Sequence, residues 1–211
     1  MTIHPLSADF AAFPFTAADF RGHIPQPASC FSAGAEIYAQ GEKADCLYQV
    51  EFGAVRVYRL LADGRRQIAA FHMAGEVFGF ETDGTHHFFA EAIGATGIRI
   101  LRLPAAGDVS RALLPLALQS LVRAQEHLLV LGRQHAPERV AAFLLDMAER
   151  QGGDNRFDLP MSRMDIADYL GLTIETVSRV FTKLKEKGVI RLASLRCVEI
   201  VRWHALREMS E

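Results

Sequence analysis

The chain has 211 residues, of which 50% are hydrophobic and 23% charged, and its formal net charge is −2. This is the composition of an ordinary globular protein of one or two domains, and it excludes a collagen, a coiled-coil rod and a disordered chain. Its longest apolar runs are far shorter than the roughly 18 residues of a membrane span, and its first twenty residues do not resemble a signal peptide. We therefore expect a cytoplasmic protein with no membrane partner.

Residues 30–104 contain short apolar runs that are interrupted by glycine. The runs cover residues 35–39, 46–52, 54–61, 67–72 and 98–103. Short strands at close spacing, separated by turn residues, are typical of an all-β roll or barrel. We expect this domain to occupy residues 1–108.

The next segment, residues 110–135, has almost no glycine and carries a heptad pattern. Its regularly spaced positions are Leu114, Leu118, Leu121, Gln125 and Leu128. The spacing predicts one long helix, assigned to residues 109–136. The pattern alone leaves two interpretations open, namely the buried face of a core helix and the interface of a dimer.

The third domain, residues 137–211, begins with an amphipathic helix over residues 138–151 and then shows the signals of two short helices. Ser162 and Asp165 fit an N-cap pattern, Gly171 is suited to a turn, and Thr173 can cap the second helix. Residues 189–192 and 198–201 flank a polar turn and predict a two-stranded wing. A helix-turn-helix of this kind places its second helix in the major groove of DNA.

Charge supports DNA binding by this domain. Residues 179–207 contain eight basic and two acidic residues, a local charge of +6 on an otherwise acidic chain. The positions from which side chains can reach base edges are Ile174, Glu175, Ser178 and Arg179. The alternative is a helical hairpin with no role in DNA binding. Motifs for nucleophilic, metal or phosphate-loop chemistry are missing from the sequence, so we do not expect an enzyme.

Residues 166–179, IADYLGLTIETVSR, resemble the recognition motif of the CRP/FNR family of bacterial transcription regulators. Residues 41–55, GEKADCLYQVEFGAV, and 75–79, GEVFG, are similar to the cyclic-nucleotide-binding roll of that family. The resemblance implies an α+β fold: an N-terminal cyclic-nucleotide-binding-like β-roll, a long dimerisation helix and a C-terminal winged helix-turn-helix. It also favours the dimer interpretation of the heptad helix.

Within the family, Glu175, Ser178 and Arg179 resemble the FNR/FixK branch, which implies a homodimer on a TTGAT-N4-ATCAA palindrome. Residues implied to hold DNA phosphates are Arg163, Thr173, Thr176 and Lys183. The corresponding loop of FNR touches RNA polymerase, which implies an activating surface at Glu81, Thr82, Asp83, Gly84, Thr85, His86 and His87. Members of the FixK branch activate microaerobic respiration and nitrogen-fixation genes without a bound effector.

The sensing chemistries of the family each need particular residues. Gly75 and Glu76 are present, but the place of the Arg-Ser pair that binds cyclic AMP holds HFFAEA, residues 87–92, so we expect no cyclic nucleotide. The chain has three cysteines, one of them in the far domain, which excludes a four-thiolate iron–sulfur cluster of the FNR type. We therefore expect no cofactor and no metal.

Two effector-gated alternatives stay open, namely haem and an unrecognised small molecule in the roll. Haem would need an axial histidine, for which the candidates are His72, His86 and His87, although His86 and His87 lie in a loop and are expected to face solvent.

Cys197 lies beside the predicted wing. It is either a small buried strand residue or a redox-sensitive thiol whose pKa is lowered by the neighbouring Arg196.

Overall fold

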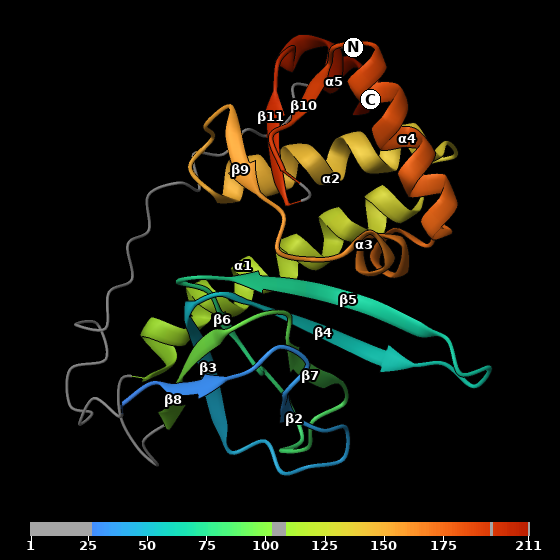
Figure 1. Cartoon of the computed structure of the whole chain (residues 1–211). Helices are drawn as coiled ribbons and strands as arrows, with labels where there is room; N and C mark the ends of the chain where they lie inside the picture. Colours follow the sequence, from blue (N-terminus) through green and yellow to red (C-terminus); the bar gives the residue numbers. More distant parts are fainter. Residues whose placement is uncertain (1–26, 103–108, 195, 211) are drawn as a thin grey trace, which may run out of the picture.

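The computed structural model describes residues 27–102, 109–194 and 196–210, and it has a β-rich N-terminal part and a mainly helical C-terminal part (Figure 1). The N-terminal strands are β1 (Ser29–Phe31), β2 (Glu36–Tyr38), β3 (Cys46–Phe52), β4 (Ala54–Leu60), β5 (Arg66–Met73), β6 (Val77–Phe78), β7 (Phe89–Ala92) and β8 (Thr96–Arg102). The remaining elements are α1 (Val109–Leu131), α2 (Ala136–Arg150), β9 (Arg156–Asp158), α3 (Arg163–Leu170), α4 (Ile174–Glu186), β10 (Ile190–Leu192), β11 (Cys197–Ile200) and α5 (Trp203–Ser210).

The strands of the N-terminal part form two antiparallel four-stranded sheets. Their orders are β1-β8-β3-β6 and β2-β7-β4-β5. Strands β3 and β4 belong to different sheets, and Gly53 connects them with φ +83°. A Cβ at Gly53 would lie 2.5 Å from the carbonyl oxygen of Ala95, so both the backbone angle and the space require glycine. Val50 and Val55, on either side of this turn, are fully buried in the roll core.

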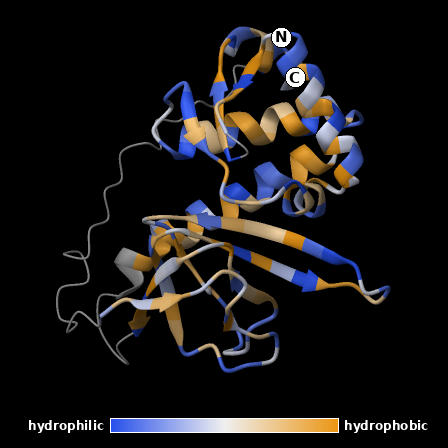
Figure 2. Cartoon of the chain, viewed as in Figure 1, coloured by the Kyte–Doolittle hydropathy of each residue, from blue (hydrophilic) through white to orange (hydrophobic). Residues whose placement is uncertain are grey.

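The C-terminal part is built around α2. Helix α2, whose apolar residues are coloured orange on the ribbon in Figure 2, packs against α4 and α5. Strand β9 joins the wing in a sheet of order β10-β11-β9. This confirms the predicted α+β fold with a winged helix-turn-helix. Strand β9 pairs with β11 and so adds a third strand to the predicted two-stranded wing. Helix α5 was not predicted.

The roll packs directly on the C-terminal domain through β5 (Figure 1). Ile68 and Phe71 of β5 belong to the same buried apolar cluster as the core of α2, α3 and α4. Phe71 lies 5.1 Å, centroid to centroid, from the ring of Tyr169 on α3. From the other side His127 of α1 stacks on Tyr169 at 3.7 Å and donates from Nε2 to the Tyr169 carbonyl oxygen at 2.9 Å. Tyr169 therefore joins the roll, the long helix and the helix-turn-helix.

Helix α1 begins at Val109, one residue after the predicted first domain boundary, which itself lies outside the described residues. The predicted limit at residue 136 coincides with the first residue of α2, after a short turn. Among the described residues, none of the helices is both long and apolar enough to cross a membrane.

Candidate nucleic-acid interface

The two helices of the helix-turn-helix begin and end where the sequence predicts. The Ser162 hydroxyl accepts from the Asp165 amide at 3.1 Å, and the Asp165 carboxylate accepts from the Ser162 amide at 2.9 Å, which completes a capping box. Gly171 ends α3 with φ +62°, a left-handed conformation that glycine adopts without strain. Thr173 caps α4 by accepting from the Thr176 amide at 3.2 Å.

Helix α4 has one buried and one exposed face. Val177, Val180, Phe181 and Leu184 are buried against the domain core. Glu175, Ser178 and Arg179 are exposed and, at positions i, i+3 and i+4, lie on one face. Ile174, the fourth predicted base-reading residue, is half-buried at the start of the helix. Three polar side chains therefore share a convex surface that can enter a groove.

The first turn of α4 holds these polar groups in an ordered arrangement. The pKa of Glu175 is lowered by the backbone amide at the helix start, by the Thr173 hydroxyl and by Arg179. Glu175 is thus an ionised acceptor, which suits the amino group of cytosine. Arg179 donates from Nη2 to the Thr176 hydroxyl at 3.3 Å, and its remaining donors are available for guanine.

The four predicted phosphate-binding residues differ in exposure. Thr173 and Lys183 are exposed and Thr176 is half-buried. Arg163 is also half-buried, since its guanidinium lies 3.4 Å from the centre of the Phe181 ring. Burial lowers the pKa of Arg163 to about 10, so the side chain stays charged at neutral pH.

Cys197 is a buried residue of β11, as the first of its two interpretations expects, and the redox interpretation stays a prediction. Its sulfur accepts a hydrogen bond from Nε of Arg156, on β9, at 3.0 Å. The sequence pointed instead to Arg196, which is adjacent in the chain but exposed. Arg156 was missed because it is 41 residues away and reaches Cys197 only through the pairing of β9 with β11.

The heptad positions of α1 are not part of the core of this chain. Leu114, Leu118, Leu121 and Leu128 are each at least half exposed, and Gln125 is exposed between them. The interpretation of this seam as the buried face of a core helix is therefore wrong. The opposite side of α1 carries the buried His127.

The carboxylate of Glu76, in the turn of the roll, forms ion pairs with two arginines of the same chain. Arg150 of α2 donates to Oε2 of Glu76 at 2.8 Å, and Arg123 of α1 lies 2.8 Å from Oε1. Arg150 also donates to the Phe71 carbonyl oxygen at 2.6 Å. Burial would raise the pKa of Glu76, but Arg150 and Arg123 outweigh it and lower that pKa. The carboxylate is therefore ionised and already paired.

The segment that replaces the Arg-Ser pair is used for packing. Phe89 stacks on Tyr58 with ring centroids 5.4 Å apart, and Phe88 packs on the roll core. Glu91 forms an ion pair with Arg56, which is also bonded to Asp165 of α3 at 3.0 Å.

Two histidines of the predicted loop lie in different environments. His87 is exposed, as expected, but the expectation that His86 faces solvent is wrong: its side chain is fully buried and stacks on Tyr38 at 3.7 Å. The reason is that the loop folds back on the roll, with the His86 amide donating to the Glu42 carbonyl oxygen. His86 is thus unable to touch another protein. His72, the third candidate haem ligand, stacks on Phe78, and burial lowers its pKa to about 4.

Both halves of the chain match known families. Residues 29–107 match the cyclic nucleotide-binding domain, and residues 138–209 match the Crp-like helix-turn-helix domain. With the exposed face of α4, these matches define the class: a DNA-binding transcription regulator that carries a sensor-type β-roll, and not an enzyme.

Within this class the chain belongs to the CRP/FNR family. It is 57% identical to the nitrogen fixation regulation protein FixK of Rhizobium meliloti (strain 1021) over 185 residues, 88% of each chain. It is 45% identical to the protein of the same name from Azorhizobium caulinodans, over 85% of this chain and 77% of the relative. Among solved structures, FixK2 from Bradyrhizobium japonicum is similar with a TM-score of 0.84 and 40% identity, over 90% of this chain and 98% of that one.

Proposed function

We propose that this protein is a homodimeric transcription activator that binds a TTGAT-N4-ATCAA-like palindrome. Glu175, Ser178 and Arg179 would read bases, with Ile174 beside them. The observation that carries the proposal is the exposed polar face of α4, with its ionised glutamate and free arginine donors. The relatives named as regulators of nitrogen fixation support control of nitrogen-fixation or microaerobic respiration genes.

Phosphate contacts would fix the position of the helix on the duplex without reading sequence. Thr173 and Thr176 lie at the N-terminal end of α4, where backbone amides also favour an anion. Lys183 is exposed further along the same helix. Arg163 would reach a DNA phosphate from α3, and this requires its guanidinium to extend beyond the Phe181 ring.

The partner in the dimer would be a second copy of α1. The exposed leucines of the seam form an apolar stripe at heptad spacing, and such a stripe is stable in water when it packs on its symmetry mate. A two-fold dimer presents two recognition helices to the two halves of a palindrome.

The arrangement of Glu76 supports activity without a bound effector. Its carboxylate is paired with Arg123 and Arg150, and these contacts already connect the roll to α1 and α2. The ion pairs of Arg56 and Arg66 with Asp165 hold α3 against the roll in the same way. An effector is not needed to make these connections, so the DNA-binding arrangement can be the favoured one in the free protein.

Fluorescence anisotropy tests the proposal directly. Purified protein, with no added ligand, is titrated onto a labelled TTGAT-N4-ATCAA duplex and onto a scrambled duplex at the same salt concentration. We expect at least a hundredfold preference for the palindrome. Equal affinity for both duplexes would overturn either the proposed half-site or the effector-free mode. If adding haem or a cell metabolite extract then restored the preference for the palindrome, the effector-gated alternative would be favoured.

We also propose that the loop at residues 81–87 contacts RNA polymerase through its exposed members, Thr82, Asp83, Gly84 and His87. Glycine and serine substitutions at Thr82 and Asp83 should abolish activation in a purified transcription assay and leave DNA affinity unchanged. Lost DNA affinity would contradict this role.

A further inference from the structure

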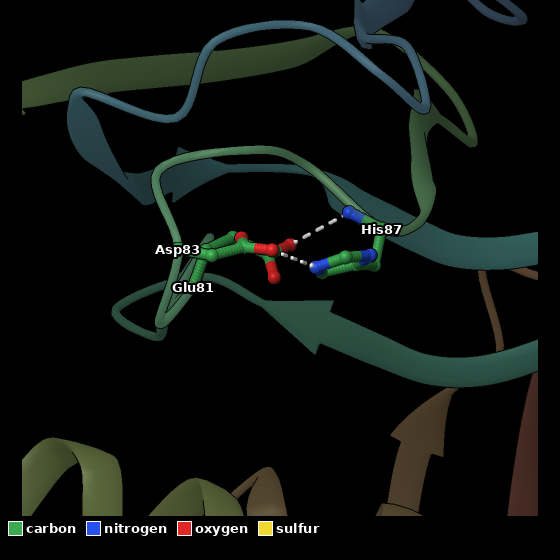
Figure 3. A group of neighbouring side chains, drawn as sticks. All are labelled: Glu81, Asp83 and His87. Carbon is green, nitrogen blue, oxygen red and sulfur yellow. Dashed lines mark hydrogen bonds and ion pairs between the residues drawn. The ribbon is translucent and has the colours of Figure 1, made fainter.

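The loop between β6 and β7 gathers two carboxylates and an imidazole at its tip. Figure 3 shows Glu81, Asp83 and His87 pointing toward one another. One potential ligand atom from each residue lies within 4.8 Å of the other two. Nε2 of His87 is 3.0 Å from Oδ2 of Asp83, and the His87 amide donates to Oε1 of Glu81 at 3.1 Å.

A second observation comes from the buried neighbour of this cluster. The His86 side chain has no exposed surface, and neither of its ring nitrogens has a hydrogen-bond partner in the described part of the chain. Nδ1 of His86 points at Oε1 of Glu81 from 3.5 Å, too far for a good hydrogen bond. Buried polar groups are normally paired, so an unpaired imidazole directed at this cluster is an independent indication that the cluster binds a ligand.

We propose that Glu81, Asp83 and His87 bind a divalent transition-metal ion, with His86 positioning Glu81. The ion would take the place of the proton that His87 shares with Asp83, so that Nε2 of His87 and one oxygen of each carboxylate become ligands. Such ions hold nitrogen and oxygen ligands at about 2.0–2.2 Å, so the three groups need only a small contraction to share one ion.

The ligand set indicates the kind of metal. An imidazole with two carboxylates and no thiolate favours a first-row transition-metal ion such as zinc or manganese over calcium, which takes oxygen ligands. Three protein ligands leave coordination positions open to water or to a partner's side chain. The protein would also need outer-sphere support for its ligands, and Nδ1 of His86, 3.5 Å from Oε1 of Glu81, would supply it once Glu81 moves closer on binding the ion.

Binding would change the surface of the loop. Glu81 and Asp83 together carry two negative charges, which a divalent ion neutralises. The ion would also connect the start of the loop to its end, because Glu81 and His87 are six residues apart. Sequence reasoning missed this site, since the spacing of the three residues matches no established metal motif and the pattern predicted no metal.

The test is calorimetric titration of chelator-treated, full-length protein with zinc chloride. We expect one saturable site per chain, with affinity lowered at least tenfold in His87→Ala and in Asp83→Asn. His86→Phe keeps the stack on Tyr38, removes both nitrogens, and should weaken binding about tenfold. Retained binding of the palindromic duplex shows that each variant is folded.

The matched control is His204→Ala. His204 is another exposed histidine beside a carboxylate, with Nε2 3.4 Å from Glu208 on α5. The His204→Ala substitution should leave zinc affinity unchanged. The proposal is overturned by the absence of saturable binding, by binding that survives His87→Ala, or by an equal loss in His204→Ala. Binding unaffected by His86→Phe would overturn the positioning role alone.

Discussion

Arg66 of the roll donates to Oδ1 of Asp165 at 2.6 Å, while the other oxygen of the same carboxylate caps α3. Arg56 also bonds to Oδ1 at 3.0 Å. Asp165 is almost completely buried, and in the described part of the chain its charge is balanced by these two arginines and the cap. One carboxylate therefore both starts the first helix of the DNA-binding motif and fixes that helix to the roll.

Asp165→Asn removes the charge but keeps an oxygen for the cap, and should destabilise the protein by about 3 kcal/mol. The reason is that two largely buried guanidinium groups each lose one of their two carboxylate partners, so that Arg56 keeps Glu91 and Arg66 keeps Asp168. Urea unfolding measures the change. The matched control is Asp63→Asn, whose partner Arg65 is exposed, and which should leave stability unchanged. Equal effects of the two substitutions would contradict a structural role for the interdomain pair.

Glu76→Gln should reduce stability by about 3 kcal/mol at pH 7, since Arg123 loses its carboxylate partner and Arg150 keeps the more exposed Asp146 in place of the buried Glu76. The pKa of Glu76 is lowered in the folded protein, so its contribution is present above the unfolded-state pKa and is lost as pH falls through the folded-state pKa. The difference between wild type and variant should therefore shrink below about pH 4.

Urea unfolding across pH 3–7 checks this pH dependence. Glu51→Gln is a suitable comparison because Glu51 pairs with Arg99 at a more exposed position, and it should cost no more than about 1 kcal/mol. A difference for Glu76→Gln that stayed constant with pH would mean that the side chain acts by packing and not by its charge.

Arg179→Ala should lower affinity for the palindrome by roughly ten- to a hundredfold and reduce discrimination at one base position, because the proposed bidentate contact to guanine would be lost. Lys183→Ala should weaken binding to all sequences alike and reduce the salt dependence by about one phosphate contact. Anisotropy titrations on single-base variants of the site, over a range of salt concentrations, separate the two patterns. Arg59→Ala, an exposed arginine on the roll, is the control and should have no effect.

Leu118→Glu should convert the protein to a monomer, because a charge in the middle of the α1 seam prevents apolar packing with a second copy. Sedimentation velocity measures the mass in solution. Leu60→Glu, at a similarly exposed leucine of β4, should leave the oligomeric state as in wild type. A Leu118→Glu protein with the mass of the wild type would place the dimer interface elsewhere.

Features that depend on neighbouring residues could be predicted from the sequence. The caps at Ser162 and Thr173 and the turn at Gly171 each involve groups within a few residues, and all are confirmed. Features that depend on residues far apart in the sequence could not be predicted. Arg56 and Asp165 are 109 residues apart, and Cys197 meets Arg156 through a strand pairing. Helix α5 has only eight residues, too few for a clear periodic pattern.

The candidate DNA-reading residues follow from local structure too, since the exposed face of α4 is set by its own amphipathic pattern. The different environments of His86 and His87 could not be predicted from local structure. Adjacent residues of a loop can be separated by the way the loop folds back, and contacts with distant residues, among them Tyr38, Tyr48 and Glu42, bury His86.

The shared carboxylate of Asp165 limits how domains of this family can be exchanged. A chimera that joins the helix-turn-helix of this chain to the roll of a relative inherits Asp165 without a guarantee of arginines at the positions of Arg56 and Arg66. Such a hybrid would bury an unbalanced charge at its own junction. Regulators with new combinations of sensor and DNA specificity should therefore be grafted with strands β4 and β5 and helix α3 as one unit.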